Sequence, residues 1–392
     1  MKRFLCILLT FSLMMGILAC GALAESDALS PEEMVAKGQQ YENGDGVDQD
    51  YALAMEWYLK AAEAGSGEAM RYIGNLYRDG NGVEQDYARA MEWYTKAVEA
   101  GHLQACRSVG YLYHYGLGVE QDYDQAMEWY LKAADAGDDG AMNNIGVLYR
   151  NGQGVDQDDT LAAEWYLKAA EAGDVNGMGN IGYMYQYGLG VDQDYTLAAE
   201  WYLKAAEAGN VSSMCNIGYM YERGFGVEQD YALAMEWYLK AADAGNAQAM
   251  NNIGALYHNG QGVKKDYTLA MEWYLKAADA GNANAMDNIG ILYYDGKGVS
   301  KNYKTAAEWY RKSAEGGKAI GMYHYARMLE KGEGVSKDLK AAAEWYRKSA
   351  EGGYAKSMYI YAQMLEKGRG VNQNPDLAKE WYDKAEAAGY KP

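Results

Sequence analysis

The segment Ala69–Gly101 reads AMRYIGNLYRDGNGVEQDYARAMEWYTKAVEAG, with a glycine-rich turn between two apolar patterns. In each half the apolar residues fall three and four positions apart, which predicts two amphipathic helices. Gly80 can adopt the left-handed conformation that ends a helix, and Asp86 is suited to cap the helix that follows. The segment therefore predicts a helical hairpin that ends at Gly101.

The same hairpin recurs along the chain with a strict period of 36 residues. Ten tryptophans mark the copies: Trp57, Trp93, Trp129, Trp165, Trp201, Trp237, Trp273, Trp309, Trp345 and Trp381. A fixed period of this length is the signature of a solenoid, in which each unit buries its apolar face against its neighbours. Because no insertion separates the copies, we expect one all-α array of ten repeats over residues 31–390, followed by a tail of residues 391–392.

The tryptophan face and a column of glycines are expected to pack together. In the segment quoted above, the second helix places four residues on one face, all of which should be buried: Ala90, Trp93, Tyr94 and Ala97. Gly74 and its equivalents form one mid-helix column, where glycine costs about 1 kcal/mol relative to alanine. We expect a close helix approach there, with tryptophan filling the adjacent space. In the last two copies the column becomes Ala326 and Ala362.

A glutamate precedes a lysine by four residues in every copy, as in Glu56 and Lys60 or Glu236 and Lys240. Such pairs on an exposed helix stabilise it by about 0.2–0.5 kcal/mol each. The pattern therefore predicts a solvated outer face with weak ion pairs.

The charge balance bears on the partner. The 392 residues contain 36 Lys+Arg and 55 Asp+Glu, for a net charge of −19. This argues against nucleic acid as a partner, because phosphate binding requires a basic surface. The charge is uneven: residues 297–392 hold 18 basic and 12 acidic side chains, whereas acidic residues predominate earlier. The basic end could steer a mixed-charge partner, favour head-to-tail association of the array or contact anionic cell-wall polymers, or it could serve only to keep the array soluble.

The N-terminus predicts export. Lys2 and Arg3 precede an apolar run that ends at Ala22-Leu23-Ala24, and this small-residue end fits a signal-peptide cleavage site. We expect residues 1–24 to be a signal peptide and residues 25–30 a short lead. A lipid anchor at Cys20 is an alternative, and a retained membrane helix is a third. No later stretch is apolar for long enough to span a membrane.

Two cysteines would remain after cleavage, Cys106 and Cys215. They lie three copies apart, and each copy adds two helices at packing distances of about 8–10 Å. A disulfide requires Cα atoms about 5.5 Å apart, so we predict no bridge between them. Cys106 shares a column with Met70 and Met142 and is expected to be buried.

A second copy, Ala249–Gly281, reads AMNNIGALYHNGQGVKKDYTLAMEWYLKAADAG and closely resembles the Sel1-like repeat (SLR) family, a relative of the tetratricopeptide repeats. The resemblance covers nearly all of the chain after residue 30. It implies antiparallel helix pairs stacked into a right-handed α-solenoid with a concave groove, and an adaptor role common among exported bacterial members. Some secreted members carry a disulfide in each repeat, which this chain lacks.

The resemblance also raises catalysis, because some relatives have been labelled β-lactamases. A serine enzyme of that kind needs Ser-x-x-Lys, and no serine in this sequence has lysine at that spacing. The four histidines form no two-histidine zinc pair at helical spacing. We therefore expect no catalytic residue, no metal site and no cofactor.

One stripe of the first helix in each copy is not needed for the core, and by analogy with related solenoids it lines the groove. One of its columns contains five asparagines: Asn144, Asn180, Asn216, Asn252 and Asn288. Amides at a regular spacing could hold the backbone of an extended peptide. They could equally bond a neighbouring helix, because a buried amide must be satisfied.

Tyrosines occur in the same stripe but only in some copies. They are Tyr111, Tyr115, Tyr183, Tyr187 and Tyr219. A requirement of the scaffold would act on every copy alike, and tyrosine is favoured at interfaces because it gives large contact area at low entropic cost. These residues therefore indicate a binding surface. Unselected sequence variation at solvent-exposed positions would give the same pattern.

Together these features predict a non-catalytic, exported scaffold that binds a protein or an extended peptide in its groove. Two alternatives stay open at this point: a hydrolase related to the β-lactamase-like members, and a structural array that binds the cell envelope.

Overall fold

The computed structural model describes residues 29–391, which form 20 α-helices and no strand. The predicted signal peptide, the alternative anchor at Cys20, residues 25–28 of the lead and Pro392 lie outside the described residues. The helices are α2 (Pro31–Asn43), α3 (Tyr51–Glu63), α4 (Gly67–Asp79), α5 (Tyr87–Glu99), α6 (Ala105–Tyr115), α7 (Tyr123–Asp135), α8 (Asp139–Asn151), α9 (Asp159–Ala172), α10 (Val175–Tyr187), α11 (Tyr195–Glu207), α12 (Val211–Arg223), α13 (Tyr231–Asp243), α14 (Ala247–Asn259), α15 (Tyr267–Asp279), α16 (Ala283–Asp295), α17 (Tyr303–Glu315), α18 (Ala319–Lys331), α19 (Leu339–Glu351), α20 (Ala355–Lys367) and α21 (Pro375–Ala387).

The predicted all-α solenoid of ten helix-turn-helix repeats is confirmed. Even-numbered helices are the first helices of the repeats and odd-numbered helices the second. The predicted helix end and N-cap are also confirmed. Gly80 ends α4 with φ +72°, and the Asp86 carboxylate accepts a hydrogen bond from the Arg89 amide at the start of α5. Ser30 and Glu33 form the capping box that opens α2.

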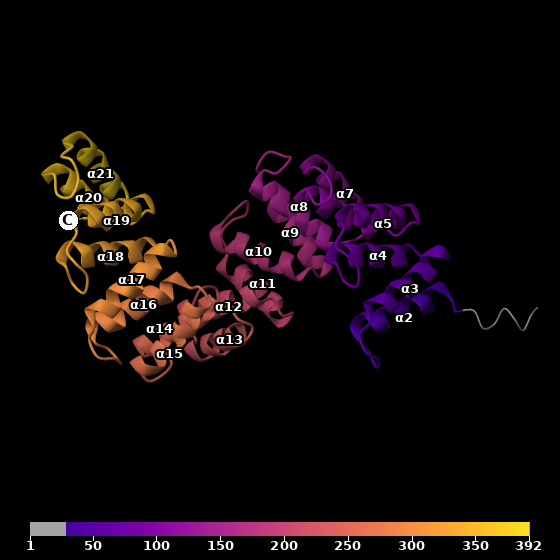
Figure 1. The fold of residues 1–392 in the computed structure, drawn as a ribbon, viewed down its shortest axis with the longest axis horizontal. Coiled ribbons are helices and arrows are strands. Elements are labelled where there is room, and N and C mark those ends of the chain that lie inside the picture. Colours follow the sequence, from indigo (N-terminus) through magenta and orange to yellow (C-terminus); the bar gives the residue numbers. More distant parts are fainter. Residues whose placement is uncertain (1–28, 392) are drawn as a thin grey trace, which may run out of the picture. The chain divides into compact units, whose positions relative to one another are not determined.

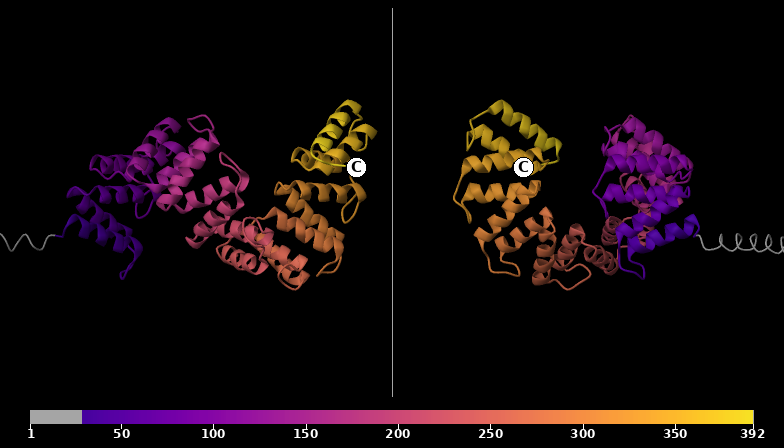
Figure 2. Two further views of the ribbon diagram at one scale, coloured as in Figure 1. Left: turned by 180° about the vertical axis from the view of Figure 1, so that it is seen from behind. Right: turned by 45° about the vertical axis from the view of Figure 1, so that its right-hand side comes forward.

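The contacts divide the chain into two units, with the boundary between Gly177 and Met178. The first unit contains α2–α9, the second contains α11–α21, and the boundary falls within α10. In each unit successive helix pairs are stacked side by side (Figures 1 and 2), so that a helix contacts the helix before it and the helix after it.

Tyrosine, rather than tryptophan, fills the space beside the glycine column. A Cβ atom on Gly254 would lie 2.6 Å from Cδ1 and Cε1 of Tyr274, a side chain that is only 2% exposed. The equivalent tyrosines of the first nine repeats are all buried: Tyr58, Tyr94, Tyr130, Tyr166, Tyr202, Tyr238, Tyr274, Tyr310 and Tyr346. The prediction that tryptophan occupies this space was wrong, because the second helix turns the residue after tryptophan toward the first helix of its own repeat.

The tryptophans instead lie at the seam between repeats, where eight of the ten are only partly buried. Trp93, for example, packs against a core cluster that joins Tyr58 and Ala61 of the preceding repeat to Ile73 and Leu76 on the first helix of its own repeat. This corrects the prediction that Trp93 is fully buried. Each tryptophan covers part of the core at the boundary with the preceding repeat. Because every boundary needs one, the tryptophans recur with the period of the repeat.

A lysine covers the outer face of every one of these ten indoles. The Nζ atom of the lysine three residues after the tryptophan lies 4.0–4.5 Å from the ring centroid in all ten repeats, as for Lys204 over Trp201. Among the ten predicted Glu–Lys ion pairs, all within the described residues, Glu236–Lys240 is the one formed, at 2.8 Å. The recurrent lysine is therefore explained mainly by its cation–π contact with tryptophan.

Candidate partner-binding surface

The asparagine column lies on the first helices, where several of its members bond the preceding repeat. Asn288 on α16 donates from Nδ2 to Oδ1 of Asn251 on α14, at 3.0 Å. His324 takes the same place in the next repeat, and its Nδ1 lies 2.7 Å from Oδ1 of Asp287. Both pairs join residues 37 positions apart, so for Asn288 the structure favours the helix-bonding interpretation.

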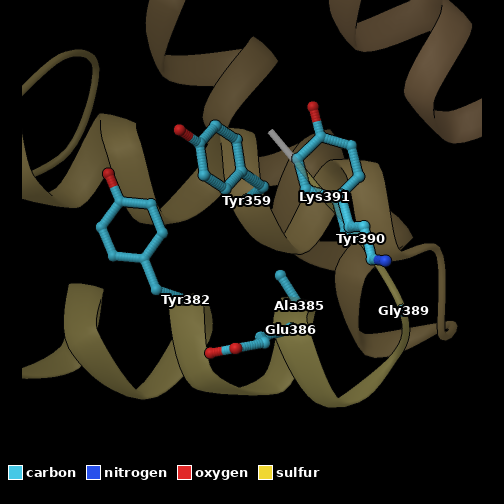
Figure 3. A pocket seen from close by; sticks show the side chains of 7 residues that line it. All are labelled: Tyr359, Tyr382, Ala385, Glu386, Gly389, Tyr390 and Lys391. Carbon is cyan, nitrogen blue, oxygen red and sulfur yellow. The ribbon is translucent and has the colours of Figure 1, made fainter.

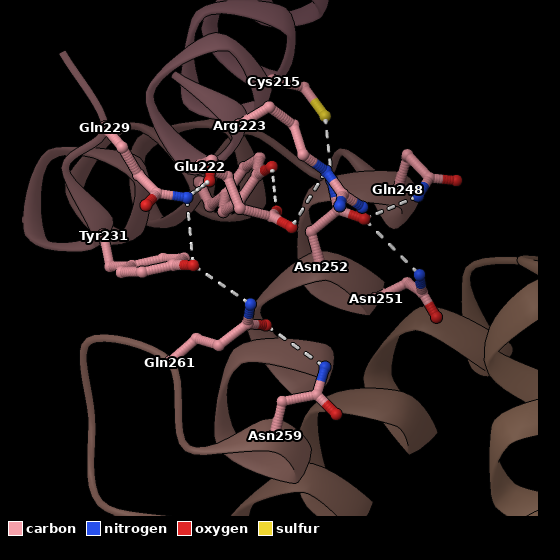
Figure 4. A network of polar contacts seen from close by, with 11 residues as sticks. Cys215, Glu222, Arg223, Gln229, Tyr231, Gln248, Asn251, Asn252, Asn259 and Gln261 are labelled. Carbon is pink, nitrogen blue, oxygen red and sulfur yellow. Dashed lines mark hydrogen bonds and ion pairs between the residues drawn. The ribbon is translucent and has the colours of Figure 1, made fainter. Parts of the chain in front are cut away.

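Asn252 belongs to a larger polar network in the second unit (Figure 4). Its Oδ1 accepts a hydrogen bond from Nε2 of Gln248 at 2.7 Å, and its Nδ2 lies 3.9 Å from Sγ of Cys215. Beside it, the Tyr238 hydroxyl donates to the Glu222 carboxylate at 2.8 Å. These contacts hold the Asn252 amide in a fixed orientation.

Asn216 is different because the position 37 residues before it is Gly179, which has no side chain to bond it. Asn216 lies instead at the edge of a hollow of about 430 Å³ on the first helices of the second unit. We call this hollow the Asn216 pocket. Its lining residues are Tyr183, Gln186, Tyr187, Tyr195, Tyr202, Cys215, Asn216, Tyr219, Phe225, Gln248 and Asn252. The structure thus brings together five of the ten predicted site residues: Tyr183, Tyr187, Tyr219, Asn216 and Asn252.

The aromatic side of the Asn216 pocket is built from two ring pairs. Tyr183 and Tyr187, one turn apart on α10, have ring centroids 4.5 Å apart, and Tyr187 is 54% exposed. On the other side, Phe225 in the loop after α12 stacks on Tyr195 at 4.9 Å and lies 6.0 Å from Tyr219. The rings are held by one another, so an apolar ligand group would meet a preformed surface.

The polar side of the pocket offers amides. The Tyr202 hydroxyl donates to Oε1 of Gln186 at 2.8 Å, which leaves Nε2 of Gln186 as a hydrogen-bond donor. No residue that lines the pocket carries an acidic or basic side chain. Burial raises the pKa of the Cys215 thiol to about 12, with the nearby Glu222 carboxylate adding to the effect. Cys215 is therefore an uncharged part of the wall near neutral pH. Both Cys106 and Cys215 are buried free thiols.

A second hollow, on the first unit, holds Tyr111 and Asn144. It has a volume of about 560 Å³ and we call it the arginine pocket. Its lining residues are Arg71, Asn75, Arg78, Asp79, Arg107, Ser108, Tyr111 and Asn144. Tyr115, one turn beyond Tyr111 on α6, has its ring centroid 4.6 Å from that of Tyr111 and is 55% exposed. Asn144 also hydrogen bonds the Tyr130 hydroxyl.

The remaining predicted asparagine, Asn180, is half-buried on α10, three residues before Tyr183. With Asn288 tied to Asn251, the ten predicted residues fall into separate groups rather than one continuous row. The structure therefore distinguishes members of the asparagine column that the sequence pattern treats as equal.

A third hollow, of about 370 Å³, lies on the last helix pair (Figure 3). Tyr359 lies between Tyr382 and Tyr390, with ring centroids 5.2 and 4.9 Å away. One repeat earlier, Tyr323 meets Tyr346 and Tyr354 in the same way, but there the following repeat covers it to 5% exposure. The last hollow is thus the stacking face of a repeat and needs no ligand to explain it.

Sequence reasoning missed several pocket residues. Phe225 carried a usable signal, because it is the one phenylalanine after residue 24. The residue between the two loop glycines is apolar only in the three copies with a groove tyrosine, as Leu117, Leu189 and Phe225. The sequence pattern also does not single out Arg71, Arg78 and Arg107, because a local basic cluster is not visible in an acidic net charge.

Within the described residues, no helix is long and apolar enough to cross a membrane. The same residues contain no group of three or more His, Cys, Asp or Glu side chains arranged to hold a metal ion.

Comparison with known proteins matches the Sel1 repeat ten times, at residues 35–66, 67–102, 103–138, 140–174, 175–210, 211–246, 247–282, 283–318, 319–354 and 355–390. A protective antigen of uropathogenic Escherichia coli strains, which displays an SLR fold, is 33% identical with a TM-score of 0.61, over 93% of this chain and 85% of that one. A Sel1 repeat protein from Oxalobacter formigenes is 34% identical with a TM-score of 0.57, over 63% of this chain and 99% of that one. No curated protein matches the chain.

Proposed function

Because this chain belongs to the Sel1 repeat family, whose solenoid fold is typical of protein–protein interaction scaffolds, we propose that it is an exported scaffold that binds an extended segment of a partner protein at the Asn216 pocket. Proteins built on such repeats are generally non-enzymatic, and the proposed role is binding without catalysis. The observation that carries the proposal is the convergence of Tyr183, Tyr187, Tyr219 and two amides on one hollow.

The chemistry of the pocket supports a neutral peptide segment as the ligand. Amide side chains can donate to and accept from a peptide backbone, and tyrosine rings can cover an apolar side chain. A volume of about 430 Å³ lies within the range of small-molecule and side-chain pockets. With no charged lining residue, the pocket imposes no desolvation cost of an unpaired charge on such a ligand.

Site-specific photo-crosslinking tests the proposal. A benzophenone amino acid replaces Tyr187, which is 54% exposed beside the pocket, and the protein is incubated with native extracellular material. The matched control carries the same group at Leu239, which is 37% exposed on the second helix α13 of the same unit. We expect an adduct from position 187 and none from 239, and mass spectrometry of the adduct gives the partner segment.

A synthetic peptide of that segment then provides the quantitative test. Calorimetry should show binding that weakens by about tenfold or more in the Tyr183→Ala/Tyr187→Ala variant and in Asn216→Ala, since contacts in an interface centre carry most of the affinity. Equal adducts from both crosslinking positions, or unchanged affinity in both variants, would show that the partner binds elsewhere.

Export rests on the N-terminal sequence alone. N-terminal sequencing of the protein from its native source should find Glu25 as the first residue. A protein that begins at a lipid-modified Cys20 would replace this proposal with the anchored form, and one that retains Met1 would contradict export by a cleaved signal.

A further inference from the structure

The arginine pocket of the first unit gathers basic side chains on an otherwise acidic surface. It is formed by three successive first helices: α4 supplies Arg71 and Arg78, α6 supplies Arg107, and α8 supplies Asn144. We propose that this pocket binds a carboxylate of a peptide, and that it is a site separate from the Asn216 pocket. The proposal stands on its own observations and does not depend on the function of the second unit.

The distribution of basic groups sets this pocket apart. Residues 29–177 contain 27 acidic and 10 basic side chains. All five lysines lie over tryptophan rings: Lys37, Lys60, Lys96, Lys132 and Lys168. Of the five arginines, three line the one pocket. Basic side chains are therefore scarce in this unit, and three of the five that do not lie over tryptophan line one pocket.

The arginines are positioned by neighbours that leave donor groups available. Arg71 uses Nε to contact Nε2 of His102 at 3.1 Å, and its guanidinium lies 4.5 Å from the Tyr72 ring centroid. The Nε atom of Arg107 lies 2.9 Å from the carboxylate of Asp138. A guanidinium has five N–H donors, so one contact through Nε does not exhaust it. The remaining face of a planar guanidinium matches the two oxygens of a carboxylate.

Arg78 is less available to a ligand than Arg71, because its guanidinium already donates two hydrogen bonds to the Asp79 carboxylate, at 2.7 and 2.8 Å. With Arg78 paired to the Asp79 carboxylate and Arg107 paired to the Asp138 carboxylate, Arg71 supplies the excess positive charge. Arg71 and Arg107 occupy equivalent positions in consecutive repeats, and the next equivalents are Asn143 and Gly179, which are uncharged. The basic site is therefore confined to these two repeats.

The neutral residues of the pocket add directed donors. The Tyr94 hydroxyl donates to Oδ1 of Asn75 at 2.9 Å, which fixes the amide and leaves Nδ2 to donate. Ser108 and Tyr111 bring hydroxyl groups to the same hollow. A pocket rich in donors, with one excess positive charge, suits a monoanionic carboxylate. The acidic surroundings oppose a phosphate, which carries about −1.5 to −2 charge at neutral pH.

Calorimetry with defined peptides tests the proposal on the full chain. The probes are N-acetylated, C-terminally amidated hexaglutamate, the matching hexaglutamine, and a neutral Gly-Ser peptide with a free or an amidated C-terminus. We expect saturable binding of hexaglutamate, of the free C-terminus, or of both, and none of the two uncharged probes. The two carboxylate probes distinguish side-chain from terminal carboxylates. Binding of inorganic phosphate without either carboxylate probe would overturn the proposal.

Variants locate the binding. Arg71→Gln/Arg107→Gln should weaken binding of the carboxylate probe by about tenfold or more, as expected for hydrogen bonds to a charged group. Arg107→Gln alone, a change on an exposed side chain, should give part of this loss and guards against misfolding of the double variant. The control is Arg89→Gln on the second helix α5, which removes one positive charge outside the pocket. An equal loss in Arg89→Gln would show general electrostatic attraction and overturn the site.

Discussion

Gly254 and Tyr274 approach so closely that no side chain larger than hydrogen fits between them. A Cβ on Gly254 would lie 2.6 Å from two ring carbons of Tyr274, and this ring is buried in a hydrophobic core cluster. Helix propensity favours alanine over glycine by about 1 kcal/mol in mid-helix. The close packing of the buried tyrosine ring against the glycine offsets this cost.

The first prediction concerns this contact. Gly254→Ala should destabilise the second unit by about 1–3 kcal/mol, the usual cost of overpacking, despite the better helix propensity of alanine. Urea unfolding followed by circular dichroism measures the change. Ser212→Ala, at an exposed position of α12, is the control and should have an effect within about 0.5 kcal/mol. A more stable Gly254→Ala protein would mean that Tyr274 can move aside at no cost.

The second prediction separates the cation–π contact from the ion pair on the second helices. In α11, Nζ of Lys204 lies 4.1 Å from the Trp201 ring centroid. Lys204→Gln should therefore cost about 0.5–1 kcal/mol at this exposed site, whereas Glu200→Gln should cost little. Denaturation curves and tryptophan fluorescence measure both. If the two variants lose the same unfolding free energy, Lys204 stabilises the helix through its ion pair with Glu200 rather than through the tryptophan.

The third prediction divides the asparagine column by role. Asn288→Ala removes the donor to Oδ1 of Asn251 and should destabilise the second unit by about 1–3 kcal/mol. Asn216 has a glycine, Gly179, at the position that Asn251 holds for Asn288, so Asn216→Ala should change stability little while weakening binding of the partner peptide. Thermal unfolding and calorimetry provide the two readouts. Equal loss of stability in both variants would place Asn216 among the structural amides.

The fourth prediction is a pH dependence from two histidines, of which His114 is buried and His258 is partly buried. Burial lowers the pKa of His114, and burial together with Lys297 and Lys265 lowers the pKa of His258. Below the unfolded pKa of about 6.5, the unfolded state therefore binds more protons than the folded state, so stability falls as pH falls. Each histidine contributes a slope of at most about 1.4 kcal/mol per pH unit.

The double variant His114→Gln/His258→Gln should therefore lose less stability than the wild type between about pH 7 and pH 5. Urea midpoints across this range measure the slopes, and values near pH 8 serve as the reference where both histidines are neutral. Parallel slopes for the two proteins would show that these histidines titrate normally in the folded chain.

The sequence was sufficient for the repeat architecture because its signals are local. A left-handed glycine such as Gly80 and an N-cap such as Asp86 act within a few residues, and ten copies of one pattern reinforce each other. The helical period also identified the face that is buried. It did not identify which aromatic residue fills the core, because Trp93 and Tyr94 differ by only 100° around the helix and both lie near its apolar stripe.

The grouping of the candidate site residues was decided by tertiary structure. Asn216 and Asn288 occupy equivalent sequence positions, yet Gly179 and Asn251 in the preceding repeats give them different surroundings. The two pockets likewise depend on side chains from several helices, as when Arg71 and Arg107 of consecutive repeats line one hollow. Periodicity determines where each repeat starts and which face it buries, whereas contacts between repeats depend on pairs of residues that only stacking brings within reach.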